Sequence, residues 1–248
     1  MSDFNRGFSR ADTPAVADMS VDAGLRAFML GVYNKVALGL VLSAAMAYLT
    51  GAYPPVSQLM FGERADGRIG LTVLGMIVAF APLAIILFSN FTRSATPRSS
   101  GIIYWAIVAL IGASLGTVVL MYTGASIATT FLITAVSFGA LSLVGYTTKR
   151  DLTGFGSFLI MGLVGLILAM LVNMFLQSSM MAFIVSVLGV LIFAGLIAYD
   201  TQRLKLTYYR LGGNADALGV ATNYGALSLY LDFINLFRFL LYFTGGRR

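Results

Sequence analysis

Seven long apolar segments follow one another along this chain. They cover Phe28–Thr50, Ile69–Phe91, Ile102–Tyr122, Ile127–Tyr146, Phe155–Phe175, Met180–Tyr199 and Tyr224–Phe243. A helix needs about 20 apolar residues to cross a bilayer, and these runs lack the alternation that is typical of barrel strands. Because a backbone in lipid must satisfy its own hydrogen bonds, the pattern predicts an all-α integral membrane protein with seven transmembrane helices.

Polar segments flank and separate these runs. We expect residues 1–27 to form a polar cytoplasmic tail, residues 28–244 the seven-helix transmembrane domain, and residues 245–248 a short C-terminal tail. Turn-forming pairs such as Gly212-Gly213 lie in the gaps. The stretch Lys205–Asn223 between the last two runs is predicted to be a long loop.

Charge indicates the orientation of these segments. Only 10% of the residues are charged, whereas soluble domains average about 25%. With the N-terminus inside, one side holds Arg6, Arg10, Arg26, Arg93, Arg98, Lys149, Arg150, Arg203, Lys205 and Arg210, and the other holds Arg64, Arg68, Arg247 and Arg248. This bias predicts a cytoplasmic N-terminus. Because the basic residues lie singly at segment ends, nucleic acid is rejected as a partner.

The chain contains no cysteine and no histidine. Disulfides, thiolate catalysis and Cys/His metal sites are therefore excluded, as is histidine as a pH switch. Without a credible nucleophile or metal cluster, we expect that the chain is not an enzyme and needs no cofactor. Short loops and the missing cysteine suit a multi-pass protein of the bacterial plasma (inner) membrane, with the lipid bilayer as its surroundings.

Two acidic residues, Asp200 and Asp232, lie within the last two apolar segments or at their ends. A carboxylate in hydrocarbon costs about 2.5–3.5 kcal/mol on insertion scales, so both are candidate functional residues. Asn235 lies three residues after Asp232 and therefore shares its helix face. For the carboxyl groups of Asp200 and Asp232 to lie at the same depth and pair, the sixth helix must continue past Asp200, through Arg203 or Lys205.

Two carboxyl groups that touch cannot both be ionised at low cost. We expect Asp200 and Asp232 to share one proton and to titrate as a unit. Once both are deprotonated they would attract Ca²⁺, which prefers oxygen ligands. The pair is therefore predicted to serve for gating and for binding the cation, with Asn235 in a supporting role.

Simpler interpretations remain open for the charged residues nearby. Asp200 could be an ordinary interfacial acid that is paired with Arg203 three residues on. Arg238 lies six residues after Asp232, about 240° around the helix. We expect Arg238 to extend to the outer membrane interface, with a role as an outer counter-charge as the alternative.

The run LYLDFINLF in the last segment, with YDTQ closing the segment before it, resembles the Bax inhibitor family, also called the transmembrane Bax inhibitor motif family. The resemblance extends over most of the chain. It implies a seven-helix fold with the last helix at its centre, and a pH-sensitive calcium leak whose gate is an aspartyl pair matching Asp200 and Asp232. It also implies an arginine at the end of the second helix that can pair with these acids, and Arg93 matches this residue by location only.

We therefore expect a pH-sensitive calcium leak channel, gated by an aspartate pair that shares a proton. Its partners would be the lipid bilayer, Ca²⁺ as the transported ion, and protons. Some bacterial members of the family are instead known as modulators of a membrane-bound AAA protease. The alternative is accordingly a non-conducting membrane regulator that binds a membrane protease or another membrane protein.

Overall fold

The computed structural model describes residues 23–63, 69–89 and 95–246. Its elements in chain order are α1 (Ala23–Ala52), α2 (Pro54–Met60), β1 (Phe61–Glu63), β2 (Ile69–Leu71), α3 (Val73–Ser89), α4 (Pro97–Ser114), α5 (Gly116–Met121), α6 (Gly124–Thr147), α7 (Thr153–Leu176), α8 (Ser179–Arg210) and α9 (Ala215–Thr244). The fold is thus almost entirely helical, as predicted. Helix α1 begins four residues before the predicted end of the polar tail, and residues 1–22 of that tail lie outside the described residues.

Six helical spans are long and apolar enough to cross a membrane: α1, α4 together with α5, α6, α7, α8 and α9. The remaining predicted crossing contains α3, which has only 17 residues and includes Pro82. At 1.5 Å per residue this helix is about 26 Å long, shorter than the roughly 30 Å of a hydrocarbon core. The predicted start of this span was wrong, because Ile69–Leu71 is a strand that pairs antiparallel with β1.

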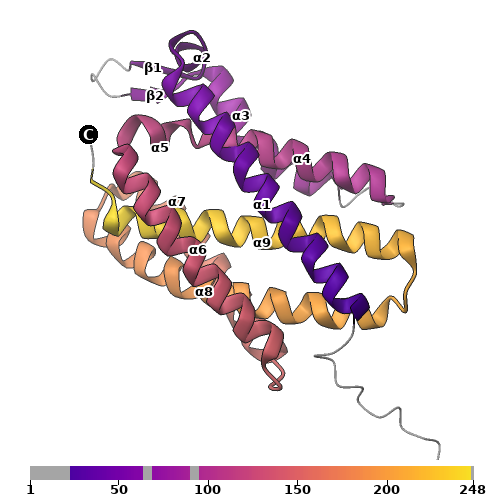
Figure 1. Cartoon of the computed structure of the whole chain (residues 1–248). Helices are drawn as coiled ribbons and strands as arrows, with labels where there is room; N and C mark the ends of the chain where they lie inside the picture. The colour runs from indigo at the N-terminus through magenta and orange to yellow at the C-terminus, as the bar shows by residue number, and fades with distance from the viewer. Residues whose placement is uncertain (1–22, 64–68, 90–94, 247–248) are drawn as a thin grey trace, which may run out of the picture.

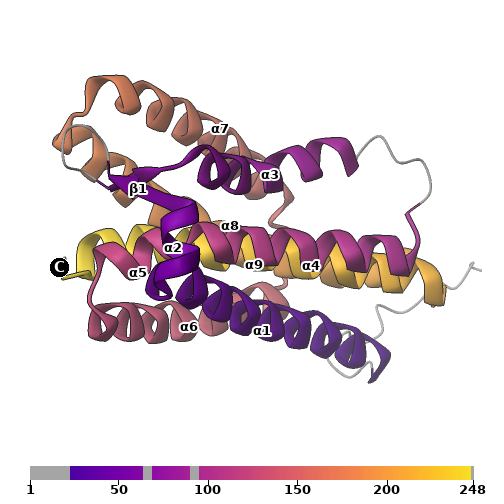
Figure 2. The ribbon, with the colours of Figure 1, turned by 90° about the horizontal axis from the view of Figure 1, so that it is seen from above.

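The spans pack in three layers around the C-terminal helix. Figure 2 shows α3 and α7 on one side, α4, α8 and α9 in the middle, and α1 and α6 on the other side. Helix α9 packs against α8, α1, α4 and α6. In its most apolar window 56% of the residues are buried, against 11–39% in the other spans. This arrangement, in which α9 crosses the centre of the molecule (Figure 1), confirms the implied position of the last helix.

Helices α8 and α9 form a tight hairpin. Helix α8 continues ten residues beyond Asp200, to Arg210, and the turn consists of residues 211–214. Gly212 and Gly213 have φ values of 56° and 82°, a backbone region that glycine adopts without strain. The predicted long loop Lys205–Asn223 was therefore wrong. Leu204 explains the extra helical turns, because its buried side chain continues the packing against α9.

Helices α6 and α8 are in close backbone contact at Gly145. A Cβ atom at this position would overlap the backbone carbonyl of Ala198, two residues before Asp200. Only glycine lets the two backbones come this near, as at other helix contacts in membranes. This contact therefore fixes the position of the part of α8 that carries Asp200.

We predict that Gly145→Ala lowers the thermal stability of the purified protein in detergent. Overpacking of this kind costs about 1–3 kcal/mol. Gly139→Ala is the matched control, because Gly139 lies on the same helix in open space. The melting temperatures of both variants check the prediction, and an equal or greater loss in Gly139→Ala would contradict it.

We predict that the two ends of α6 face opposite sides of the membrane, with Thr148 in the cytoplasm. The charge bias places the basic residues after Thr148 inside. In sealed cells an impermeant thiol reagent should label Gly124→Cys and spare Thr148→Cys until the membrane is opened. The reverse labelling pattern would show that α6 crosses the membrane in the opposite orientation.

Candidate functional site

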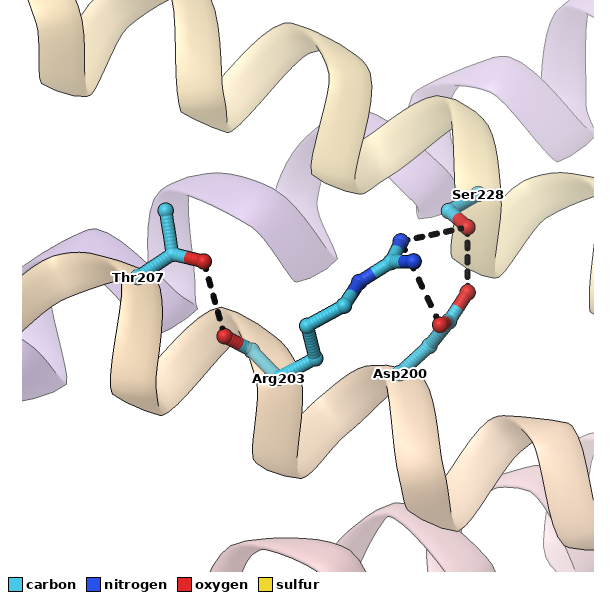
Figure 3. A network of polar contacts seen from close by, with 4 residues as sticks. All are labelled: Asp200, Arg203, Thr207 and Ser228. Carbon is cyan, nitrogen blue, oxygen red and sulfur yellow. Dashed lines mark hydrogen bonds and ion pairs between the residues drawn. The ribbon is translucent and has the colours of Figure 1, made fainter. Parts of the chain in front are cut away.

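Asp200 lies at the centre of a small polar network between α8 and α9. Its buried side chain accepts a hydrogen bond from the hydroxyl of Ser228 on α9. The Nη2 atom of Arg203 lies 3.3 Å from Oδ1 of Asp200 and donates a 3.3 Å hydrogen bond to Ser228. Figure 3 shows both side chains directed at the Asp200 carboxyl group. The ion pair with Arg203, left open by the sequence, is thus present.

Asp232 lies one helical turn beyond Ser228, on the same face of α9. Its carboxyl group is close enough to that of Asp200 for the two to interact, and the charge of Arg203 acts on both acids. The structure thus brings the two predicted acids together. The α8 extension that this pairing required is also present.

One oxygen of the pair lacks a hydrogen-bond donor. Within the described part of the chain, Oδ2 of Asp232 is buried and has no hydrogen-bond partner. A buried polar atom without a partner carries its full desolvation penalty. A bound proton or a cation would remove this penalty, so Oδ2 is the atom of the pair best suited to receive one.

Both acids line a cavity of about 760 Å³. Helix α9 supplies a polar stripe to its wall, made of Ser228, Asp232, Asn235 and Arg238. Helix α7 supplies an apolar wall on another side, made of Ile160, Leu163, Ile167 and Met170. The cavity therefore connects the acid pair with a part of α9 that lies nearer the C-terminus.

The other predicted site residues have different positions. Asn235 lines the cavity beside Asp232, and its Nδ2 atom donates a 2.8 Å hydrogen bond to the carbonyl of Leu231. Arg93, the predicted gate counter-charge, lies outside the described residues. Arg203 supplies a counter-charge to Asp200 in the structure.

The sequence interpretation missed Ser228 and did not foresee that Arg238 borders the same cavity. Ser228 lies four residues before Asp232, and this spacing could have identified it as a neighbour on the same face. Arg238 lines the cavity. The 240° between Arg238 and Asp232 is only about 120° in the other direction, so the two residues border one broad face of α9.

The oxygens present fit a hydrated cation that is bound briefly. Within the described ranges, no three acidic side chains come together to hold a metal ion. Ca²⁺ takes about 6–8 oxygen ligands, and two carboxylates with the hydroxyl of Ser228 supply only part of that number. Water in the cavity would have to supply the rest.

Comparison with known proteins connects the chain to a widespread bacterial group. The family model described as "Inhibitor of apoptosis-promoting Bax1" matches residues 25–248. An uncharacterized protein of Caulobacter vibrioides is 61% identical over the full length of both chains. Inner membrane protein YbhL of Escherichia coli is 41% identical, over 91% of this chain and 94% of its own. An uncharacterized membrane protein of Streptococcus pyogenes serotype M3 is 37% identical, over 90% of this chain and 94% of its own.

We predict that Ser228→Ala destabilises the protein by about 1–3 kcal/mol, because a buried carboxylate loses its hydrogen-bond donor. Thermal unfolding in detergent measures the change. Ser157→Ala is the control, since the hydroxyl of Ser157 is exposed and donates to the carbonyl of Thr153 on its own helix. Equal stability of the two variants would show that the hydroxyl of Ser228 contributes nothing to the network.

Proposed function

We propose a transport function for this chain, which belongs to the Bax inhibitor family of membrane proteins. Its six apolar spans and its relatives make it a multi-pass integral protein of a bacterial inner membrane, as predicted. The proposed function is a pH-sensitive calcium leak, gated by Asp200 and Asp232. The observation that carries this proposal is that both acids interact with each other on the wall of one intramembrane cavity.

In the proposed closed state the site has no net charge. Asp200 and Asp232 share one proton and so carry one negative charge, which Arg203 balances. The hydroxyl of Ser228 connects Asp200 to Arg203. The shared proton is proposed to lie between one oxygen of Asp200 and one oxygen of Asp232. A neutral cluster of this kind is stable away from water, because no charge is left unpaired.

The proposed open state follows from loss of the proton. Two ionised carboxylates repel each other and attract a divalent cation. Arg203 is able to leave the pair, because its side chain is 47% exposed. Ca²⁺ would then bind between the acids, with the carbonyl oxygen of Asn235 and water as further ligands. Rising pH removes the proton, so it should increase both Ca²⁺ binding and the leak.

Three further parts of this proposal come from the sequence and the family resemblance. The N-terminus lies in the cytoplasm, which places the acid pair nearer the inner surface. Arg93 acts as a second counter-charge in one state of the gate. The chain has no enzymatic activity and uses no cofactor, so Ca²⁺ is its cargo.

The apolar α7 wall of the cavity favours a second candidate function. A hydrated ion needs polar groups along its whole path, and Ile160, Leu163 and Ile167 offer none. A non-conducting regulator needs no such path. It would bind a membrane protease or another membrane protein through an apolar helix face.

We predict that calcium efflux from proteoliposomes rises between about pH 6 and 8, and that Asp200→Asn and Asp232→Asn each flatten this rise. Because only one shared proton is released, the rate of calcium efflux can rise by at most about tenfold per pH unit. Either change leaves a single ionisable group, so the repulsion between two charges is lost. Both variants should also bind Ca²⁺ more weakly than the wild type.

Asp151→Asn is the matched control for these variants. Asp151 lies in the loop between α6 and α7, and hydrogen bonds from the side chain and backbone of Thr153 hold the pKa of its carboxyl below the usual value. It therefore stays ionised throughout this pH range, and its variant should keep the wild-type profile. A wild type without calcium efflux would support the regulator, and an unchanged profile in both dyad variants would place the gate elsewhere.

A further inference from the structure

Arg238 is a cation inside the membrane without an acidic partner in the described structure. Among the described residues the one ion pair joins Arg203 to Asp200, and no carboxylate pairs with Arg238. Among the residues that the structure describes, the acids that line the same cavity are Asp200 and Asp232, and Arg203 already interacts with both of them. An intramembrane arginine is costly unless an anion or water meets it, so this end of the cavity favours a negatively charged ligand.

Arg238 lies close to the C-terminal end of α9. Arg238 lies six residues before Thr244, the last residue of α9, which is about 9 Å at 1.5 Å per residue. A long arginine side chain bridges much of that distance towards the interface. Tyr122 is close enough to interact with its charge, and Thr117 lines the same cavity. A phosphate at this level would therefore meet a guanidinium group with hydroxyl-bearing residues nearby.

Apolar side chains from two helices, α3 and α7, also line the cavity that contains Arg238. Each of these helices packs mainly against a helix other than α9. Leu83 of α3 lines the cavity together with Leu163 and Ile167 of α7. Helix α3 packs mainly against α4, and α7 against α8. Figure 2 shows α3 and α7 on the same side of the middle layer. This side of the cavity is thus bounded by lipid-facing helices and has the polarity of an acyl chain.

We propose that the cavity binds one anionic phospholipid from the bilayer. Its phosphate group binds Arg238, and an acyl chain lies along the apolar wall of α7. Basic pockets between transmembrane helices bind acidic lipid headgroups in this way. A lipid matches both the single positive charge and the apolar wall, whereas a free inorganic anion matches the charge alone. The proposal does not depend on calcium conduction.

The test measures lipid retained by the purified full-length protein in neutral detergent. Native mass spectrometry after addition of phosphatidylglycerol, phosphatidylcholine or inorganic phosphate separates the possible ligands. We expect the wild type to bind phosphatidylglycerol in preference to phosphatidylcholine, and to gain thermal stability from it. Arg238→Gln should weaken phosphatidylglycerol binding by about tenfold, the effect of one charged hydrogen-bonded contact. Arg210→Gln, an exposed arginine at the end of α8 that does not line the cavity, should bind like the wild type.

A second variant tests the wall independently of the charge. Leu163→Trp fills the cavity beside α7, so it should reduce phosphatidylglycerol retention while Arg238 stays in place. Equal retention of both lipids by the wild type, or unchanged binding in Arg238→Gln, overturns the proposal. Stabilisation by inorganic phosphate equal to that by phosphatidylglycerol also overturns it, in favour of a free anion. If Arg238→Gln does not fold, Arg238→Lys and the comparison of the two lipids on the wild type decide the question.

Discussion

The cost of placing ionisable groups away from water governs the centre of this molecule. Asp200 and Asp232 lie on the two most closely paired helices, where each can use the charge of Arg203. Broken pairs of this kind are strongly destabilising, because they leave one buried charge uncompensated. The surrounding helices therefore have to hold α8 and α9 in one register. The tight contact at Gly145 and the central position of α9 both serve that requirement.

The length of the apolar runs predicted most of the helices, because length and hydropathy are local properties of the chain. The limits of α8 could not be predicted in this way. Its last ten residues are polar enough to resemble a loop, and they are helical because Leu204 packs against α9. The start of the second predicted span failed for a related reason, since Ile69–Leu71 is apolar but pairs with β1. Tertiary contacts decide the structure where local preference is weak.

The candidate site was predicted in part. The two acids could be identified, because an acid in an apolar segment is rare and costly. Ser228 gave no such signal, since a serine in a membrane helix costs little. That Arg238 borders the cavity could not be foreseen, because helical angles give the direction of a side chain and not the width of the cavity beside it. Local spacing therefore identifies candidate groups, but packing decides which of them meet.

The four-residue turn between α8 and α9 has a consequence for the biogenesis of the protein. The acid pair, its arginine and its bridging serine all belong to one continuous helical hairpin. Two helices joined this closely can enter the bilayer as a unit during synthesis. The carboxylate of Asp232 then need not enter hydrocarbon alone, because its neighbours arrive with it. The charged centre would be neutralised before the earlier helices close around it.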